Sequence, residues 1–325
     1  MVRSSDNAPQ MHKNNPRPLD AGLATGLALA VTGAIAFSGK AIIVKLAYRY
    51  GVDAVTLIML RMLFALPFFL AIVWWSARKA PDGTEVPRLT RKDMAGIVGL
   101  GFTGYYLASF FDFAGLAYIS ASLERLILYL NPTLVLLLGL LFYKRRISRH
   151  QALGMGISYC GVLVVFGHEV QLAGSHVALG AVLVFFSAVS YAFYLTYSGE
   201  LVKRLGSLRL VGLATSVACV FCIAQYLVLR PWDAALSVAP EVLWLSVVNA
   251  LLCTVVPVLM VMMAIERIGP GLAAQVGMIG PLSTILMGVL LLGEPFTGFV
   301  VAGTVFVLAG IYVCSKARPA AADVT

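Results

Sequence analysis

The chain has 325 residues, of which 60% are hydrophobic and only 12% charged, and its mean hydropathy is +0.90. The surface of a soluble domain needs about a quarter of its residues charged, so this composition excludes a soluble globular protein and indicates one embedded in lipid. The formal net charge of +9 comes from basic residues beside apolar runs. Such placement is typical of membrane proteins and does not indicate nucleic-acid binding.

Apolar runs of the length that crosses a bilayer, about 20 residues, follow one another along the chain. A polar segment, residues 1–20, precedes the first run. That run is too long for the apolar core of a signal peptide, so we interpret it as a retained first span. Turns such as Tyr50-Gly51 and Gly269-Pro270-Gly271 separate the runs. The pattern predicts ten transmembrane helices, at residues 22–46, 53–76, 93–116, 120–143, 148–168, 177–199, 208–229, 240–264, 270–292 and 297–315.

One stretch of the sequence occurs twice. A forward shift of 149 residues, without a gap, places Ile119–Val164 on Ile268–Val313. Proline and glycine fix helix geometry and close packing, and the shift aligns one such proline pair and three glycine pairs: Pro132 with Pro281, Gly139 with Gly288, Gly154 with Gly303 and Gly161 with Gly310. We therefore expect an internal duplication, with units at residues 21–168 and 177–316 between polar tails at 1–20 and 317–325.

The basic residues of the connections predict the orientation. If the N-terminus is cytoplasmic, nearly all of these residues lie on the cytoplasmic side, and only Arg49 and Arg230 lie outside. The excess of Lys and Arg in cytoplasmic loops therefore predicts that both termini are cytoplasmic. Because each unit crosses the membrane five times, the second unit starts from the outside, and the two repeats are expected to be inverted.

The chain resembles the bacterial EamA-type branch of the drug/metabolite transporter superfamily. The resemblance covers nearly everything from Gly22 to Lys316, and its motifs include Ser38-Gly39-Lys40, Leu60-Arg61, Leu130-Asn131-Pro132, Ile279-Gly280-Pro281 and Leu291-Leu292-Gly293-Glu294-Pro295. The first copy departs from the pattern, because Tyr143-Lys144-Arg145 stands where the second has Leu292-Gly293-Glu294. The acidic turn is therefore missing once, which weakens any role assigned to Glu294.

The resemblance implies an all-α polytopic membrane protein in the bacterial inner membrane. Its ten transmembrane helices would form two inverted five-helix repeats around a central cavity. Members of the superfamily move small organic solutes, such as amino acids, organic acids, vitamins or drug-like compounds, and export is expected rather than uptake.

A charge inside a span costs a few kcal/mol or more, and six charged residues of the spans stand out: Lys40, Arg61, Asp112, Glu124, Arg125 and, near a span end, Lys45. The functional interpretation is a cationic vestibule that admits a carboxylate or phosphate. The structural interpretation is interhelical ion pairing, for example of Asp112 with Arg125 or Lys40, with Arg61 as a structural residue. Lys45 is expected to extend to the membrane interface.

Polar and aromatic residues recur at helical spacing on several spans. Examples are Tyr105, Ser109 and Asp112 in the third span. Such stripes predict a cavity lined by aromatic, amide and charged groups, although the same residues also join helices by hydrogen bonds. The candidate solute-binding residues are Lys40, Tyr105, Asp112, Arg125, Tyr129, Asn131, Tyr191, Tyr194, Asn249 and Gln275.

Pro132 and Pro281 stand at matched places in the fourth and ninth spans. Proline frees backbone carbonyls within the membrane and permits bending, which suits the rocking of one repeat against the other. A static kink explains both prolines equally well. Together with Arg61 they are the expected structural or hinge residues.

The segment Gly99-x-Gly101-x-x-Gly104 matches a dinucleotide-binding fingerprint. That fingerprint requires a preceding strand and a βαβ context. Here it lies inside an apolar span, so we expect these glycines to allow close helix packing.

The duplication, the inverted topology and the resemblance predict a secondary transporter that works by alternating access. The alternatives are an integral-membrane enzyme and a receptor or scaffold without transport. The sequence shows no catalytic pair, metal-ligand cluster or nucleotide-binding loop, so we expect no catalytic residue, metal or cofactor. The expected partners are a small-molecule solute and the lipid bilayer, with no nucleic acid, and a monomer and a homodimer are both compatible with the sequence.

Overall fold

The computed structural model describes residues 18–76, 78, 88–144, 147–277 and 279–316, and within these ranges all regular secondary structure is helical. Nine helical stretches of the described residues are long and apolar enough to cross a membrane, and Ile279–Leu292 is a shorter apolar one. These stretches confirm the expected ten-helix membrane protein. The tail at 317–325 and most of the tail at 1–20 lie outside the described residues.

The first five spans contain seven α-helices and one π-helical segment, η1. They are α1 (Pro18–Tyr48), α2 (Ala54–Ser76), α3 (Arg91–Leu100), η1 (Gly101–Leu107), α4 (Ala108–Leu116), α5 (Ala121–Leu128), α6 (Asn131–Tyr143) and α7 (Arg149–Ala173). The third span consists of α3, η1 and α4, and the fourth of α5 and α6. Side-chain caps start several helices: Thr90 with Asp93 and Ser148 with Gln151 form capping boxes at α3 and α7.

The second five spans follow the same plan. They contain α8 (His176–Leu205), α9 (Ser207–Leu229), the 3₁₀ turn η2 (Trp232–Leu236), α10 (Pro240–Ala250), η3 (Leu251–Val255), α11 (Val256–Gly277), α12 (Ile279–Met287), η4 (Gly288–Leu292) and α13 (Gly298–Lys316). Gly269, with φ 77°, breaks α11 where the sequence predicts the turn between the eighth and ninth spans. The ninth span therefore comprises the end of α11, α12 and η4.

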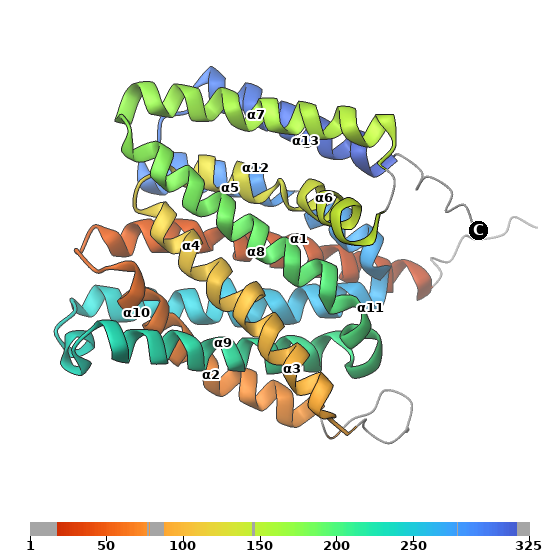
Figure 1. Ribbon diagram of the computed structural model, residues 1–325, viewed down its shortest axis with the longest axis vertical. Helices are drawn as coiled ribbons and strands as arrows, with labels where there is room; N and C mark the ends of the chain where they lie inside the picture. The colour runs from red at the N-terminus through yellow and green to blue at the C-terminus, as the bar shows by residue number, and fades with distance from the viewer. Residues whose placement is uncertain (1–17, 77, 79–87, 145–146, 278, 317–325) are drawn as a thin grey trace, which may run out of the picture.

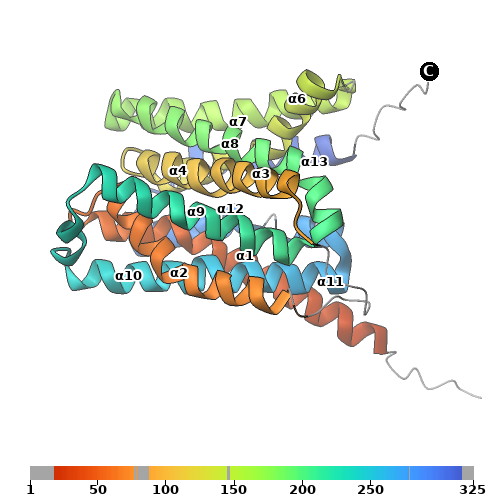
Figure 2. The same cartoon turned by 60° about the horizontal axis from the view of Figure 1, so that its bottom comes forward.

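Helix packing follows a pseudo-two-fold relation between the repeats. The second span packs on the seventh, α2 on α9, and the fifth on the tenth, α7 on α13 (Figure 1). The first span packs on the eighth, α1 on α11, while the third packs on the sixth, α4 on α8. If each span is replaced by its equivalent in the other repeat, the pair of spans one and eight becomes the pair of spans six and three. Figure 2 shows α6, α7 and α8 in the upper part of the view and α1, α2, α10 and α11 in the lower part.

Backbone irregularities are repeated as well. The π-helical segments η1 and η3 lie at matched places in the third and eighth spans. The fourth span is interrupted between Leu128 and Asn131, where α5 ends and α6 begins. Lys144 and Gly293, which the shift of 149 residues superposes, both adopt left-handed backbone, with φ 52° and 73°. The duplication therefore preserves backbone shape where the side chains have diverged.

The bundle has two ends, which we name after glycines in their turns. At the Gly51 end, Lys45 Nζ donates to the carbonyl of Ile119 (2.6 Å), and Tyr118 stacks on His176 at 6.2 Å. Because α1 ends there and α8 begins there, the two repeats run in opposite directions. At the Gly206 end, Arg204 pairs with Asp93 at 2.6 Å. α1 begins and α13 ends at this end, on the right of Figure 1.

The duplicated glycines hold α7 against α13. A Cβ on Gly161 would lie 2.6 Å from the carbonyl oxygen of Gly303, and one on Gly154 would lie 2.5 Å from that of Gly310. The shift of 149 residues aligns Gly154 with Gly303 and Gly161 with Gly310. The contacts are crossed, because Gly161 packs against Gly303 and Gly154 packs against Gly310. The glycines thus let the two backbones approach closely in the apolar environment.

We predict that Gly161→Ala lowers the stability of the detergent-solubilised protein by about 1–3 kcal/mol, because overpacking of a close contact costs that much. Thermal unfolding measures the effect. Gly156→Ala on the same helix is the matched control, since a Cβ there meets no atom within 4 Å, and it should melt at or slightly above the wild-type temperature. Equal melting temperatures for the two variants would contradict the prediction.

Candidate functional site

A central cavity of about 560 Å³ lies between the two repeats, a volume usual for small-molecule sites. Its lining comes from α1, α2, η1, α4, α5, α6, α8, α9, η3 and α11. At one end of the lining are charged residues of the first repeat, and the side chains continue past a group of tyrosines to Ser198, Val202 and Ser207 near the Gly206 end.

A chain of ion pairs forms the charged end. Lys40 Nζ lies 2.5 Å from Asp112 Oδ2 and 3.8 Å from Glu124 Oε1, and Arg125 Nε lies 3.8 Å from Glu124 Oε2. All four residues are buried, Glu124 completely. Two cations and two acids make this series of ion pairs neutral, which lowers the cost of placing charges inside the membrane. Of the two expected partners for Asp112, the structure brings Lys40 and not Arg125 into contact.

Arg61 stands apart from that chain. Its side chain is buried, its Nη2 donates to Ser109 Oγ (2.9 Å), and its guanidinium lies 4.8 Å from the ring centre of Phe113. Among the described residues, no carboxylate oxygen lies within 4.0 Å of it. The ion pair expected for Arg61 is therefore absent among the residues that the structure describes, because Asp112 is already paired with Lys40.

Tyrosines form the middle of the cavity. The hydroxyls of Tyr105 and Tyr194 are 3.1 Å apart with their rings edge to face, and Tyr191 stacks on Tyr194 at 5.4 Å. Tyr194 packs directly against Gly104, where any Cβ would collide with the ring. A Cβ on Gly101 would lie 2.5 Å from the carbonyl of Ala214. Two of the three fingerprint glycines thus serve close packing, as their place in an apolar span predicts.

The interruption of the fourth span lies against the ninth span beside the cavity. Tyr129 Oη donates to the carbonyl of Gly277 (2.8 Å), and Ser38 Oγ lies 2.7 Å from the carbonyl of Ala34 on its own helix and 2.9 Å from that of Gly280. The residue four positions after Gly277 is Pro281, which has no N–H, so the Tyr129 hydroxyl satisfies a carbonyl that would lack a donor in the membrane. Pro132 is in the first turn of α6 rather than inside a continuous kinked helix, and Pro281 lies in α12. A hinge role for either remains a prediction.

The cavity brings together eight of the ten candidate residues: Lys40, Tyr105, Asp112, Arg125, Tyr129, Asn131, Tyr191 and Tyr194. Asn249 is not part of the lining. It is fully buried in α10, with no hydrogen-bond partner for its amide among the described residues. Gln275 lies in α11, and its side chain is outside the described residues.

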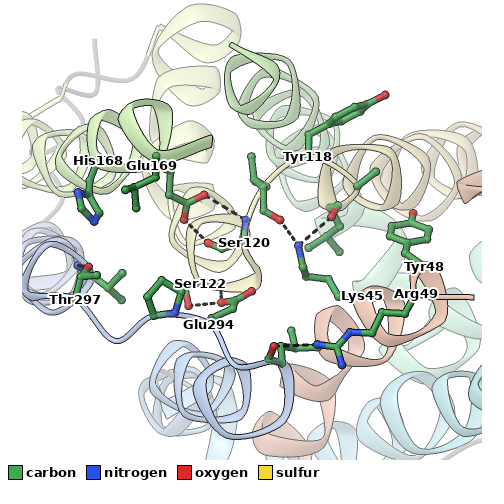
Figure 3. A pocket seen from close by; sticks show the side chains of 17 residues that line it. Lys45, Tyr48, Arg49, Tyr118, Ser120, Ser122, His168, Glu169, Glu294 and Thr297 are labelled. Carbon is green, nitrogen blue, oxygen red and sulfur yellow. Dashed lines mark hydrogen bonds between the residues drawn. The ribbon is translucent and has the colours of Figure 1, made fainter. Parts of the chain in front are cut away.

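A second pocket, of about 540 Å³, lies at the Gly51 end (Figure 3). Here the Glu294 carboxylate accepts hydrogen bonds from the backbone N–H of Ala121 (2.7 Å) and from Ser122 Oγ (2.9 Å). Glu169 accepts from the N–H and hydroxyl of Ser120. Two carboxylates from distant segments therefore cap the N-terminus of α5, where the helix dipole favours negative charge.

Two cations complete the contacts at this end. Lys45 donates to the carbonyls of Leu116 and Ile119 at the end of the bundle, and Arg49 Nη2 donates to that of Leu292 (2.9 Å). Sequence patterns alone do not predict this network, because the predicted fifth span ends at residue 168, before Glu169, whereas α7 continues to Ala173. The acidic turn at Glu294 and the capping serine at 120 were the available signals.

Comparison with known proteins identifies the relatives of the chain. The EamA-like transporter family matches residues 24–167 and 178–316. The uncharacterized transporter YcbK of Bacillus subtilis is 30% identical over 281 residues, covering 83% of this chain and 86% of that protein. A probable amino-acid metabolite efflux pump of Salmonella typhimurium is 22% identical and covers 67% of this chain and 75% of its own length. A crystal structure with 16% identity superposes with a TM-score of 0.60, over 90% of this chain and 98% of that chain, and shows the same fold.

We predict that Glu294→Gln lowers stability by about 1 kcal/mol, because the amide loses the negative charge at the N-terminus of α5. Thermal unfolding in detergent measures the change. Glu266→Gln, at an exposed position of α11, makes the same chemical change without a capping contact and should leave the melting temperature unaltered. If both variants unfold like the wild type, the cap does not contribute to stability.

Proposed function

This chain belongs to the EamA-like transporter family, and we propose that it moves a small organic solute out of the cytoplasm by alternating access. The observation that carries this proposal is the central cavity, which lies where the two repeats meet and offers both charged and aromatic groups. Binding sites at the interface of inverted repeats, formed by interrupted helices, are typical of secondary carriers.

The proposed orientation places the Gly206 end in the cytoplasm. Basic residues of the described connections gather there, including Lys92, Lys144, Lys203, Arg204 and Arg267, whereas Arg49 and Arg230 are at the other end. Positive charge is retained on the cytoplasmic side of membrane proteins. In a bacterial inner membrane this arrangement also places both termini in the cytoplasm.

In this orientation, two features support loading of the carrier from the cytoplasm. The cavity lining reaches Ser207 at the Gly206 end, whereas Glu169 and Glu294 tie α5 to neighbouring segments at the other end. Release to the outside would require these capping contacts to break. The relative named as an amino-acid metabolite efflux pump supports the outward direction.

The cavity residues take distinct roles in this proposal. Lys40, Asp112 and Arg125 bind or orient the polar part of the solute, and Tyr105, Tyr191 and Tyr194 contact its apolar part. Tyr129 and Asn131 lie beside the helix interruption at Pro132, so movement there would couple binding to rocking of the repeats. Pro281 marks the matched position in the second repeat.

Counterflow in liposomes tests the carrier function. Vesicles containing the purified protein and loaded with amino acids or organic acids should exchange a labelled solute saturably, unlike protein-free vesicles. Tyr194→Ala should lower the rate at least about tenfold, because it removes an aromatic wall of the cavity. The control Tyr197→Ala changes an exposed tyrosine one turn away on α8 and should retain exchange. Solute binding without any exchange would instead favour a receptor.

Thiol labelling tests the orientation and the state of the cavity. In a variant without native cysteines, Ser109→Cys inside the cavity should react with a membrane-impermeant thiol reagent in inside-out vesicles but not in intact cells. Tyr118→Cys, exposed at the Gly51 end, should show the opposite pattern. Labelling of Ser109→Cys in intact cells only would reverse the proposed orientation or open end.

A further inference from the structure

The cavity carries one positive charge in excess. Its charged lining residues are Lys40, Arg61, Asp112 and Arg125, and Glu124 lies directly behind them. Lys40 and Arg125 are balanced by the two acids of the ion-pair chain, so Arg61 is the surplus cation. A buried charge without an ionic partner is unfavourable in a protein and more so within a bilayer. A partner supplied from outside the chain would remove this penalty.

Arg61 also has donors left for such a partner. Its Nη2 binds Ser109, but its Nε is buried without an acceptor among the described residues, as is the Nε of Arg125. A guanidinium presents several N–H groups in a planar fork that matches a carboxylate with two parallel hydrogen bonds. Arg61 lines the cavity, so its guanidinium can meet a carboxylate there, and a bond to the Nε, which is itself buried, requires the side chain to shift towards the cavity.

The rest of the cavity restricts the body of the ligand. From the charged end the lining passes to Tyr105, Tyr191 and Tyr194, whose rings pack in contact with one another. Aromatic walls accommodate flat apolar groups. A solute with its charge at Arg61 would place its apolar part among these tyrosines, towards the Gly206 end.

Resting on the proposed carrier function, we infer that the transported solute is a monocarboxylate with an aromatic or similarly flat apolar body, and that Arg61 binds its carboxylate. One negative charge balances the cavity. A zwitterion would leave the surplus charge in place, and a dianion would reverse it. Arg61 is thus a specificity-determining residue instead of a scaffold cation.

Binding of three matched probes to the detergent-purified protein tests the inference. The probes are 3-phenylpropionate, its neutral amide 3-phenylpropanamide, and L-phenylalanine, which adds an ammonium group. Dissociation constants come from the ligand-dependent rise in melting temperature. The wild type should bind 3-phenylpropionate at least about tenfold more tightly than either other probe, the factor expected for one charge-assisted pair. Equal or tighter binding of the amide or of phenylalanine overturns the inference.

Substitutions then assign the preference to Arg61. Arg61→Gln should weaken 3-phenylpropionate at least about tenfold while leaving the amide unchanged, and Arg61→Lys should retain part of the preference because it keeps the charge but loses the fork. Lys203→Gln lowers the net charge equally at an exposed site outside the cavity and should behave like the wild type. An unchanged affinity of Arg61→Gln for 3-phenylpropionate overturns the inference.

The melting temperature of the ligand-free protein provides a test that depends on no probe. If Arg61 serves the ligand, Arg61→Met removes an unbalanced buried charge, and the melting temperature should equal or exceed that of the wild type. If Arg61 is structural, loss of its contacts with Ser109 and Phe113 lowers the melting temperature, which refutes the inference.

The two proposals can fail separately. Counterflow of neutral or zwitterionic solutes that is insensitive to Arg61→Gln would refute the anion site and leave the carrier function intact. Carboxylate binding that requires Arg61, without exchange of any solute in liposomes, would do the reverse.

Discussion

The ion pair between Lys40 and Asp112 determines the chemistry of the cavity. It joins α1 to α4 at 2.5 Å inside a region where an unpaired charge is strongly unfavourable. Because this contact uses the nearest acid, and Glu124 lies between Lys40 and Arg125, the only cavity cation without an ionic partner among the described residues is Arg61. These ion pairs thus stabilise the packing of the first repeat and leave Arg61 as the charge that a solute meets.

Backbone carbonyls without a helical donor are a second constraint on a protein inside the bilayer. A break in a transmembrane helix exposes carbonyls that no water reaches, so side chains must satisfy them. Tyr129 does so across the boundary between the repeats, because it donates to the carbonyl of Gly277, for which Pro281 offers no N–H. This hydrogen bond links the interrupted fourth span to the ninth span beside the cavity. A movement of one repeat against the other would therefore act directly on the groups that surround a solute.

The duplication is symmetric in backbone and asymmetric in chemistry. One π-helical segment and one left-handed turn recur at matched places in both repeats, and equivalent glycines pack α7 against α13. Among the described residues, the charged ones that line the cavity all come from the first repeat. At the Gly51 end, Glu294 of the second repeat caps α5 of the first. In the matched turn of the first repeat, where Lys144 stands at the position of Gly293, the acidic residue is missing. The matched backbones thus give two similar repeats that could rock against each other, and the different side chains give the two ends of the bundle different interactions.

The sequence by itself determined the environment, the number of spans and their duplication, because composition, apolar run length and the spacing of proline and glycine are local properties. It also determined the inward-facing stripe of Tyr105, Ser109 and Asp112, since helical periodicity fixes which residues share a face. Only the tertiary structure decided which residues pair. Lys40 meets Asp112 across 72 positions, and Glu294 meets Ala121 across 173. Such partners depend on the packing of whole helices, which no local pattern encodes, and this is why Arg61 was expected in an ion pair and Glu294 was given little weight.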